Sequence, residues 1–216
     1  MGLKRQVETN TRRMRMLMIM VREDIKRRTE NCKDIDEWMD KLSPFIQEDV
    51  FVTGLYSEKM SEIIQKIIDV VTISKLPKGM NQSLTKGVIS ECCYTYVSGV
   101  TKEMQTEMQK FAVECYNKKM TPVEIAKALG ERFDNLTKAR CQAIARTETM
   151  RASNLANLIQ ARNRGAKGYT VFCNKGACDY CIAEYGKHED TVYDINDTVN
   201  FPPLHPNCRC TPAFRY

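Results

Sequence analysis

The stretch that decides the fold lies near the C-terminus, where the chain reads CDYC at residues 178–181 and HPNCRC at residues 205–210. Two cysteines separated by two residues can turn both thiolates toward one ion. A distant pair of ligands then completes the tetrahedron, as in structural zinc sites. Thiolate and imidazole ligands favour zinc over harder ions. We therefore expect a structural Zn²⁺ ion that ties these two segments together.

Five side chains are candidates for the four positions around this ion. Cys178, Cys181 and His205 are the first three expected ligands. Alternate residues of an extended segment point the same way, so either Cys208 or Cys210 can be the fourth. We favour Cys208, because its spacing from His205 mirrors the first cysteine pair, and we keep Cys210 as the alternate.

The residues around these motifs predict a small module with short strands. After Gly168, strands are expected at residues 169–173, 191–195 and 211–214. Aliphatic residues are few here, so we expect the zinc ion to supply much of the folding free energy, about 10–16 kcal/mol in small modules. Cys173 is expected in the core. Disulfides are not expected in a reducing compartment.

Upstream of this module the sequence is helical. A capping box at Thr121 and Glu124 marks one helix start, and breaks are expected at Pro44 and at Gly130 or Phe133. The predicted fold class is α+β, mainly α, with a long helical part followed by the zinc-stapled, β-containing module. Apolar periodicity predicts helices over residues 3–29, 31–43, 57–74, 83–118, 121–130 and 136–164.

The net charge of +6 is concentrated at the N-terminus, where the first 28 residues hold nine basic and three acidic side chains. A basic segment on a neutral body predicts contact with nucleic acid or an acidic protein surface, the alternative being a solvated helix face. No stretch approaches the roughly 20 apolar residues of a membrane span. The expected contact residues are Arg12, Arg13, Arg15, Arg22, Arg27 and Arg28.

Three short motifs follow one another along the chain: IARTE at 144–148 on an alanine-rich helix, then CDYC at 178–181, then PPLHPNCRC at 202–210. Together they resemble the phage Mu F-like, head-morphogenesis family of minor head proteins. The resemblance covers about residues 121–214. The expected domains are therefore a helical region, 1–120, with the basic N-terminal segment, and a Mu F-like domain, 121–216, that comprises helices over 121–164 and a zinc-bound β module over 168–216.

The resemblance implies a structural minor head protein of a tailed phage or prophage, and no enzymatic activity. It implies a place inside the virion head, at the portal and near packaged double-stranded DNA, after assembly in the host cytoplasm. The implied partners are the portal protein and other head proteins, with no membrane, and the implied roles are head assembly and DNA packaging or delivery. Arg146, Glu148 and Arg151 are expected to form a polar clamp toward the zinc-bound tail or the portal; the alternative is a solvated ion pair.

Two other functions are kept as alternatives. One is a small zinc-module nuclease with His188 or His205 as the base. Against it, a catalytic zinc keeps an open position, whereas ligands are in surplus here, and no HExxH or zinc-deaminase arrangement occurs. The other is a cellular nucleic-acid-binding protein with a zinc ribbon. Against it, residues 173–216 hold four basic and six acidic side chains.

Overall fold

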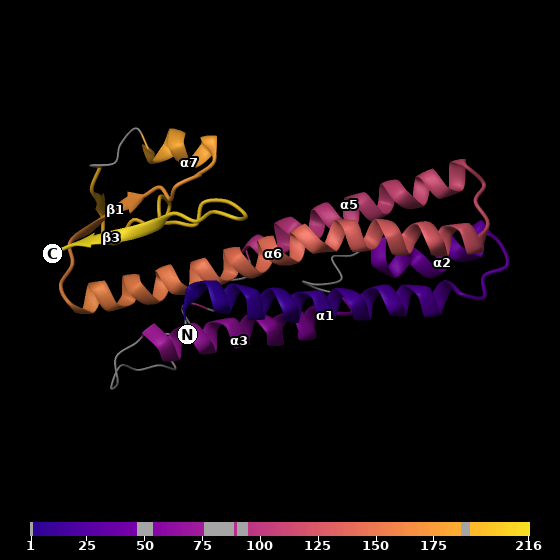
Figure 1. The fold of residues 1–216 in the computed structure, drawn as a ribbon, viewed down its shortest axis with the longest axis horizontal. Coiled ribbons are helices and arrows are strands. Elements are labelled where there is room, and N and C mark those ends of the chain that lie inside the picture. Colours follow the sequence, from indigo (N-terminus) through magenta and orange to yellow (C-terminus); the bar gives the residue numbers. More distant parts are fainter. Residues whose placement is uncertain (1, 47–53, 76–88, 90–94, 187–190) are drawn as a thin grey trace.

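In the computed structural model, a bundle of long helices carries a small sheet near one end (Figure 1). The structure describes residues 2–46, 54–75, 89, 95–186 and 191–216. The helices are α1 (Leu3–Thr29), α2 (Ile35–Ile46), α3 (Ser57–Lys75), α5 (Thr95–Asn117), α6 (Pro122–Asn163) and α7 (Asp179–Glu184), and the strands are β1 (Gly168–Phe172), β2 (Tyr193–Asp194) and β3 (Thr211–Arg215). The mainly helical class with a C-terminal β part is therefore confirmed.

The core of the bundle lies where α1 and α3 pack along α6. Apolar residues recur on one face of α1 and one face of α3, as their helical spacing predicts. The facing side of α6 contributes small residues, which let the helix axes approach closely. The buried side chains include Met14, Leu17, Met18, Val21 and Ile25 of α1, Met60, Ile64, Ile67, Ile68 and Val71 of α3, and Ala145, Ala152 and Ala156 of α6.

The two helices predicted on either side of Gly130 are one helix, α6, of 42 residues. Thr121 and Glu124 cap its start in the expected capping box. Glycine inside a helix costs only about 1 kcal/mol relative to alanine, and contacts just after it, from Arg132 to Glu114 of α5 and from Asp134 to Arg22 of α1, favour the continuous helix. The predicted break at Gly130 or Phe133 is therefore wrong. At 1.5 Å per residue, α6 is about 63 Å long.

One further helix boundary differs from the sequence prediction, and another lies outside the described residues. The break expected at Pro44 is wrong, because α2 continues to Ile46 with Pro44 in its last turn. Phe45 is buried there and lies 6.5 Å from the ring of Tyr56, so packing favours the longer helix. The helix predicted from residue 83 is described as α5 from Thr95, while residues 83–94, apart from Ile89, lie outside the described part of the chain.

The C-terminal module is a three-stranded antiparallel sheet in the order β2-β1-β3. Its core is aromatic. Tyr169 is fully buried, stacks on Tyr193 at 5.3 Å and meets Phe201 edge-on at 5.2 Å. Tyr185 is also buried and donates a hydrogen bond to the carbonyl of Asn200. Aromatic side chains thus supply the apolar contacts for which the sequence offers few aliphatic ones.

Candidate metal centre

Two short segments place the candidate ligands. Cys178 is the N-cap of α7 and Cys181 lies in its first turn, so this helix, absent from the prediction, points both thiols the same way. The second segment turns back on itself before β3, where the N–H of Cys208 donates to the carbonyl of His205 over 3.2 Å. Asn207, inside this turn, adopts a φ of 69°, a conformation that asparagine tolerates better than most residues.

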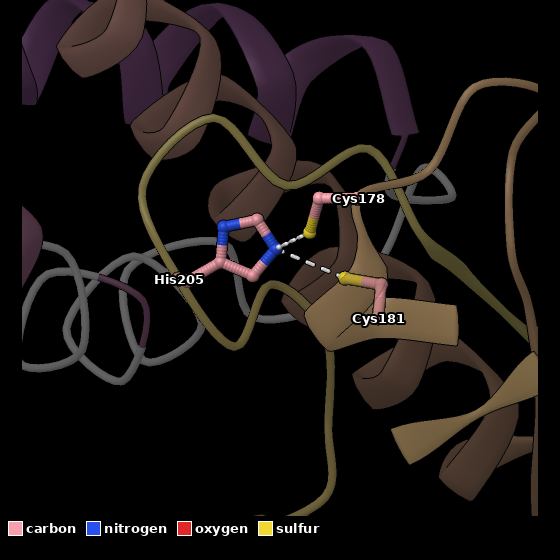
Figure 2. A group of neighbouring side chains, drawn as sticks. All are labelled: Cys178, Cys181 and His205. Atoms are coloured by element: carbon pink, nitrogen blue, oxygen red, sulfur yellow. Dashed lines mark hydrogen bonds between the residues drawn. The ribbon is translucent and has the colours of Figure 1, made fainter. Parts of the chain in front are cut away.

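Three of the predicted ligands converge on one point (Figure 2). His205 Nε2 lies 3.2 Å from Cys178 Sγ and 2.9 Å from Cys181 Sγ. The carbonyl of Pro206 can only accept a hydrogen bond, so His205 Nδ1, 2.7 Å away, carries the proton. Nε2 therefore faces the two thiols. An imidazole that is oriented through its other nitrogen in this way is the arrangement found in metal sites.

Cys208 extends this group. Its Sγ lies 3.7 Å from Cys181 Sγ, close to the edge of about 3.8 Å expected for two thiolates on one tetrahedral zinc ion. The corresponding nitrogen–sulfur edge is about 3.6 Å, so His205 Nε2 would move away from both sulfurs of α7 when an ion binds between them. Cys181, Cys208 and Cys210 form a second group of neighbouring thiols that shares Cys181 with the first. The donor set fits zinc, and the structure brings the five candidates into two adjoining groups of three.

The thiols of this cluster are unequal. Burial raises the pKa of Cys181 to about 12. A hydrogen bond from Cys210 lowers the pKa of Cys208, and the same bond raises the pKa of Cys210. Cys208 is therefore the more readily ionised of the C-terminal pair. Cys173, expected in the core, is half-buried and lies 3.9 Å from Cys210, sulfur to sulfur.

The helix α6 contacts the C-terminal segment through several polar side chains. Arg146 donates to Asn207 Oδ1 over 2.6 Å, and Arg151 donates to the carbonyl of Pro203 over 2.9 Å. Both arginines of the expected clamp thus reach the tail. Glu148 is fully buried, so a solvated ion pair does not describe it.

Sequence reasoning missed two residues of this contact. The hydroxyl of Thr147 accepts a hydrogen bond from the N–H of Asn207. The amide of Asn154 donates to the carbonyls of Pro202 and Cys210 over 3.0 and 3.3 Å. Both residues are buried in an alanine-rich helix, and a polar side chain on such an apolar face was the available signal.

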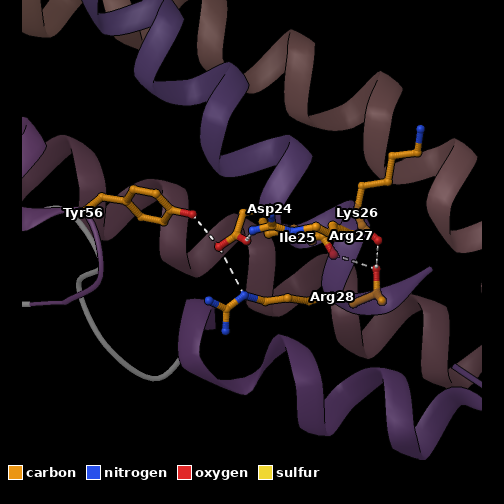
Figure 3. A network of polar contacts seen from close by, with 7 residues as sticks. Asp24, Ile25, Lys26, Arg27, Arg28 and Tyr56 are labelled. Carbon is orange, nitrogen blue, oxygen red and sulfur yellow. Dashed lines mark hydrogen bonds and ion pairs between the residues drawn. The ribbon is translucent and has the colours of Figure 1, made fainter. Parts of the chain in front are cut away.

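The six basic residues expected to touch a partner divide into two groups. Arg12 and Arg15 are exposed, and no ion pair involves them within the described residues. Arg22 pairs with Glu23 and Asp134, while Arg27 and Arg28 pair with Asp24, which also accepts a hydrogen bond from Tyr56 (Figure 3). Arg13 hydrogen-bonds to Asn10. The uncompensated charge of this segment therefore lies toward its first half.

The nuclease alternative finds little support in the described site. His205 has one ring nitrogen against a carbonyl and the other against two sulfurs. Its imidazole is therefore engaged on both sides. His188 lies outside the described residues.

None of the helices that the structure describes is long and apolar enough to cross a bilayer.

These features define a mainly helical protein whose Cys/His-rich C-terminal module is fastened to its longest helix. A family model described as Phage Mu protein F like protein matches residues 58–213, and the chain belongs to that family. The expected family is therefore confirmed, and its model also includes α3 and α5, upstream of residue 121. The family is one of structural phage head morphogenesis proteins. No curated protein and no solved structure matches the chain.

Proposed function

We propose that this protein is a minor head protein of a tailed phage or prophage that acts at the portal during head assembly and DNA packaging or delivery, without enzymatic activity. The match to the family over residues 58–213 carries the proposal. The site is consistent with it, because its histidine and cysteines face one another as the ligands of a structural metal ion do. The inferred partners are the portal protein, other head proteins and packaged DNA.

The test uses the phage or prophage whose genome encodes this chain. Heads purified from cells carrying the intact gene should contain the protein in a few copies, and chemical cross-linking should join it to the portal protein. Heads from a deletion mutant should form fewer DNA-filled particles. Absence of the protein from purified heads, or unchanged packaging and delivery in the mutant, would contradict the proposal.

We further propose that one Zn²⁺ ion binds Cys178, Cys181, His205 and Cys208. Three of these side chains converge on one point, and the fourth lies at a tetrahedral edge distance from Cys181. When bound, zinc would neutralise the thiolates and join the α7 segment to the loop before β3, without redox chemistry of its own. Cys210 is assigned outside the ligand set.

Elemental analysis of the purified full-length chain tests this ligand set. About one zinc ion per chain is expected for the unmodified protein and for the Cys210→Ser variant, and a strong loss for Cys178→Ser and Cys208→Ser. Cys32→Ser is the matched control, since Cys32 is buried near α2, in the helical bundle. Zinc retained by Cys208→Ser and lost by Cys210→Ser would reverse the assignment.

The basic N-terminal segment is proposed to contact a polyanion, and DNA is the favoured one. Exposed Arg12 and Arg15 support this, because their charges are not compensated by acidic side chains of the described chain. An acidic surface of a head protein remains the alternative. The two differ in salt dependence, because binding to DNA releases condensed counterions.

A further inference from the structure

Cys173 and Cys210 occupy opposite positions on two paired strands. The register of β1 and β3 ends with Phe172 opposite Thr211. One step further along the same register, Cys173 lies opposite Cys210, and their sulfurs are 3.9 Å apart. Directly opposed residues of an antiparallel pair are close enough at their β-carbons for a cross-strand disulfide.

This pair adjoins the proposed metal ligands but does not belong to them. Four ligands complete a structural zinc site, and Cys178, Cys181, His205 and Cys208 provide them. Cys210 is then outside the ligand set, and its thiol lies against Cys208 on one side and Cys173 on the other. The two cysteines of the module that are not proposed ligands, Cys173 and Cys210, are therefore neighbours of each other.

The two thiols differ in accessibility. Cys173 is half-buried, whereas Cys210 is only 1 % exposed. Cys210 lines a pocket of about 320 Å³ that the proposed zinc ligands also line. Cys173 is therefore the more accessible first nucleophile, and Cys210 is placed to resolve the product.

We propose that Cys173 and Cys210 form a disulfide by exchange with a small-molecule disulfide, such as glutathione disulfide. Cys173 Sγ attacks one sulfur of the reagent, forming a mixed disulfide and releasing one glutathione. Cys210 Sγ then attacks the Cys173 sulfur and releases the second glutathione. Two protein thiols are oxidised, the reagent is reduced to two thiols, and the two protons pass to the leaving thiolates.

The disulfide would close a loop that contains every proposed zinc ligand. β1 and β3 would then stay joined at the ligand end of the sheet even without the metal. The dithiol is the form expected in a reducing cytosol, and the disulfide is the form expected in an oxidising medium outside the cell. The proposal depends on the geometry of the sheet and not on a role in the phage head.

Trypsin separates the relevant cysteines, which permits a direct test. Cleavage after lysine and arginine gives peptide 168–175 with Cys173, 176–187 with Cys178 and Cys181, 188–209 with Cys208, and 210–215 with Cys210. The zinc-loaded full-length protein is treated with glutathione disulfide, alkylated and digested without reduction. Mass spectrometry should find peptide 168–175 linked to 210–215 as the main product, with zinc still bound.

Two results would overturn the proposal: Cys173 remaining fully alkylated, or linkage chiefly between other peptides. Zinc release in proportion to disulfide formation would also overturn it, since Cys210 would then be a ligand. As a second measurement, chelator-treated oxidised protein should resist proteolysis of the module at least about tenfold longer than Cys173→Ser treated identically. Cys32→Ser should behave like the unmodified protein, and equal lifetimes for all three would count against a bridge.

Discussion

The backbone N–H of Asn207 donates a 2.7 Å hydrogen bond to the side-chain hydroxyl of Thr147, across 60 residues of sequence. Thr147 is fully buried in α6, whereas Asn207 lies in the turn between His205 and Cys208. The loop that carries two proposed metal ligands is therefore anchored to the longest helix of the bundle. The stability of the C-terminal module should therefore depend on its hydrogen bonds to α6.

Replacing Thr147 by valine should destabilise the protein by about 0.5–1.5 kcal/mol, because the N–H of Asn207 would lose its acceptor. Denaturant unfolding monitored by circular dichroism would measure the change. Thr106→Val is a matched control: both hydroxyls donate to the carbonyl four residues earlier, but Thr106 is exposed on α5. Equal effects of the two substitutions would show that the contact with Asn207 contributes nothing.

Removing the metal under reducing conditions should loosen the module and leave the bundle folded. Hydrogen exchange with a strong chelator present should be at least about tenfold faster at Val171 in β1 and Ala213 in β3, because the ligand loops lose their common anchor. Exchange at Ile67 in α3 should not change. Unaltered protection of β1 and β3 would mean that the aromatic core and the contacts with α6 suffice.

Asp24 should make stability depend on pH. Burial acts to raise the pKa of this carboxyl, but hydrogen bonds from Tyr56 and Arg27 and the charge of Arg28 hold that pKa below its usual value. Its contribution is therefore complete above the unfolded pKa of about 3.9 and is lost as the pH falls through the lower folded value. Asp24→Asn should cost about 1 kcal/mol at neutral pH, and the difference should shrink below about pH 4.

Paired unfolding curves across this pH range would measure the effect of Asp24. Glu62→Gln, on the exposed surface of α3, supplies the control for removal of one negative charge. A difference between Asp24→Asn and the unmodified protein that stays constant from neutral to acidic pH would rule out the ionised carboxylate as its source.

If the N-terminal segment binds DNA, the double substitution Arg12→Gln and Arg15→Gln should weaken binding and reduce its salt dependence. Each lost phosphate contact lowers the slope of log affinity against log salt by about 0.9. Lys110→Gln with Lys118→Gln changes the net charge equally, but these lysines pair with Glu107 and Glu114 on α5. Fluorescence anisotropy in a salt series should separate the two variants, and identical curves would exclude a contact by Arg12 and Arg15.

Much of the fold could be predicted, because local signals and packing agree. The apolar spacing of Met14, Leu17 and Met18 predicts the buried face of α1, and the capping box at Thr121 predicts the start of α6. The break predicted at Gly130 is wrong, because an isolated glycine is a weak helix breaker and tertiary packing favours a continuous helix there. The contacts that extend a helix lie far away in sequence, so periodicity could not reveal them.

Part of the candidate site could be predicted from the sequence for the same reason. The spacing of Cys178 and Cys181 is local, and it predicts two thiols turned to one side. The pairing of Cys173 with Cys210 depends on the register of two strands 37 residues apart, which no local pattern specifies. Thr147 and Asn154 were missed because they bond to main-chain groups of the C-terminal segment. Every residue has such groups, so the sequence does not indicate which of them will be a partner.

The unbroken helix α6 has a mechanical consequence. It is packed along α1 and α3 over part of its length, and near its C-terminal end it holds the Cys/His-rich module. A stiff rod of about 63 Å turns a tilt of about 5° at one end into a displacement of about 5 Å at the other. A partner protein that binds the module and tilts it by this amount would therefore displace the distant end of α6.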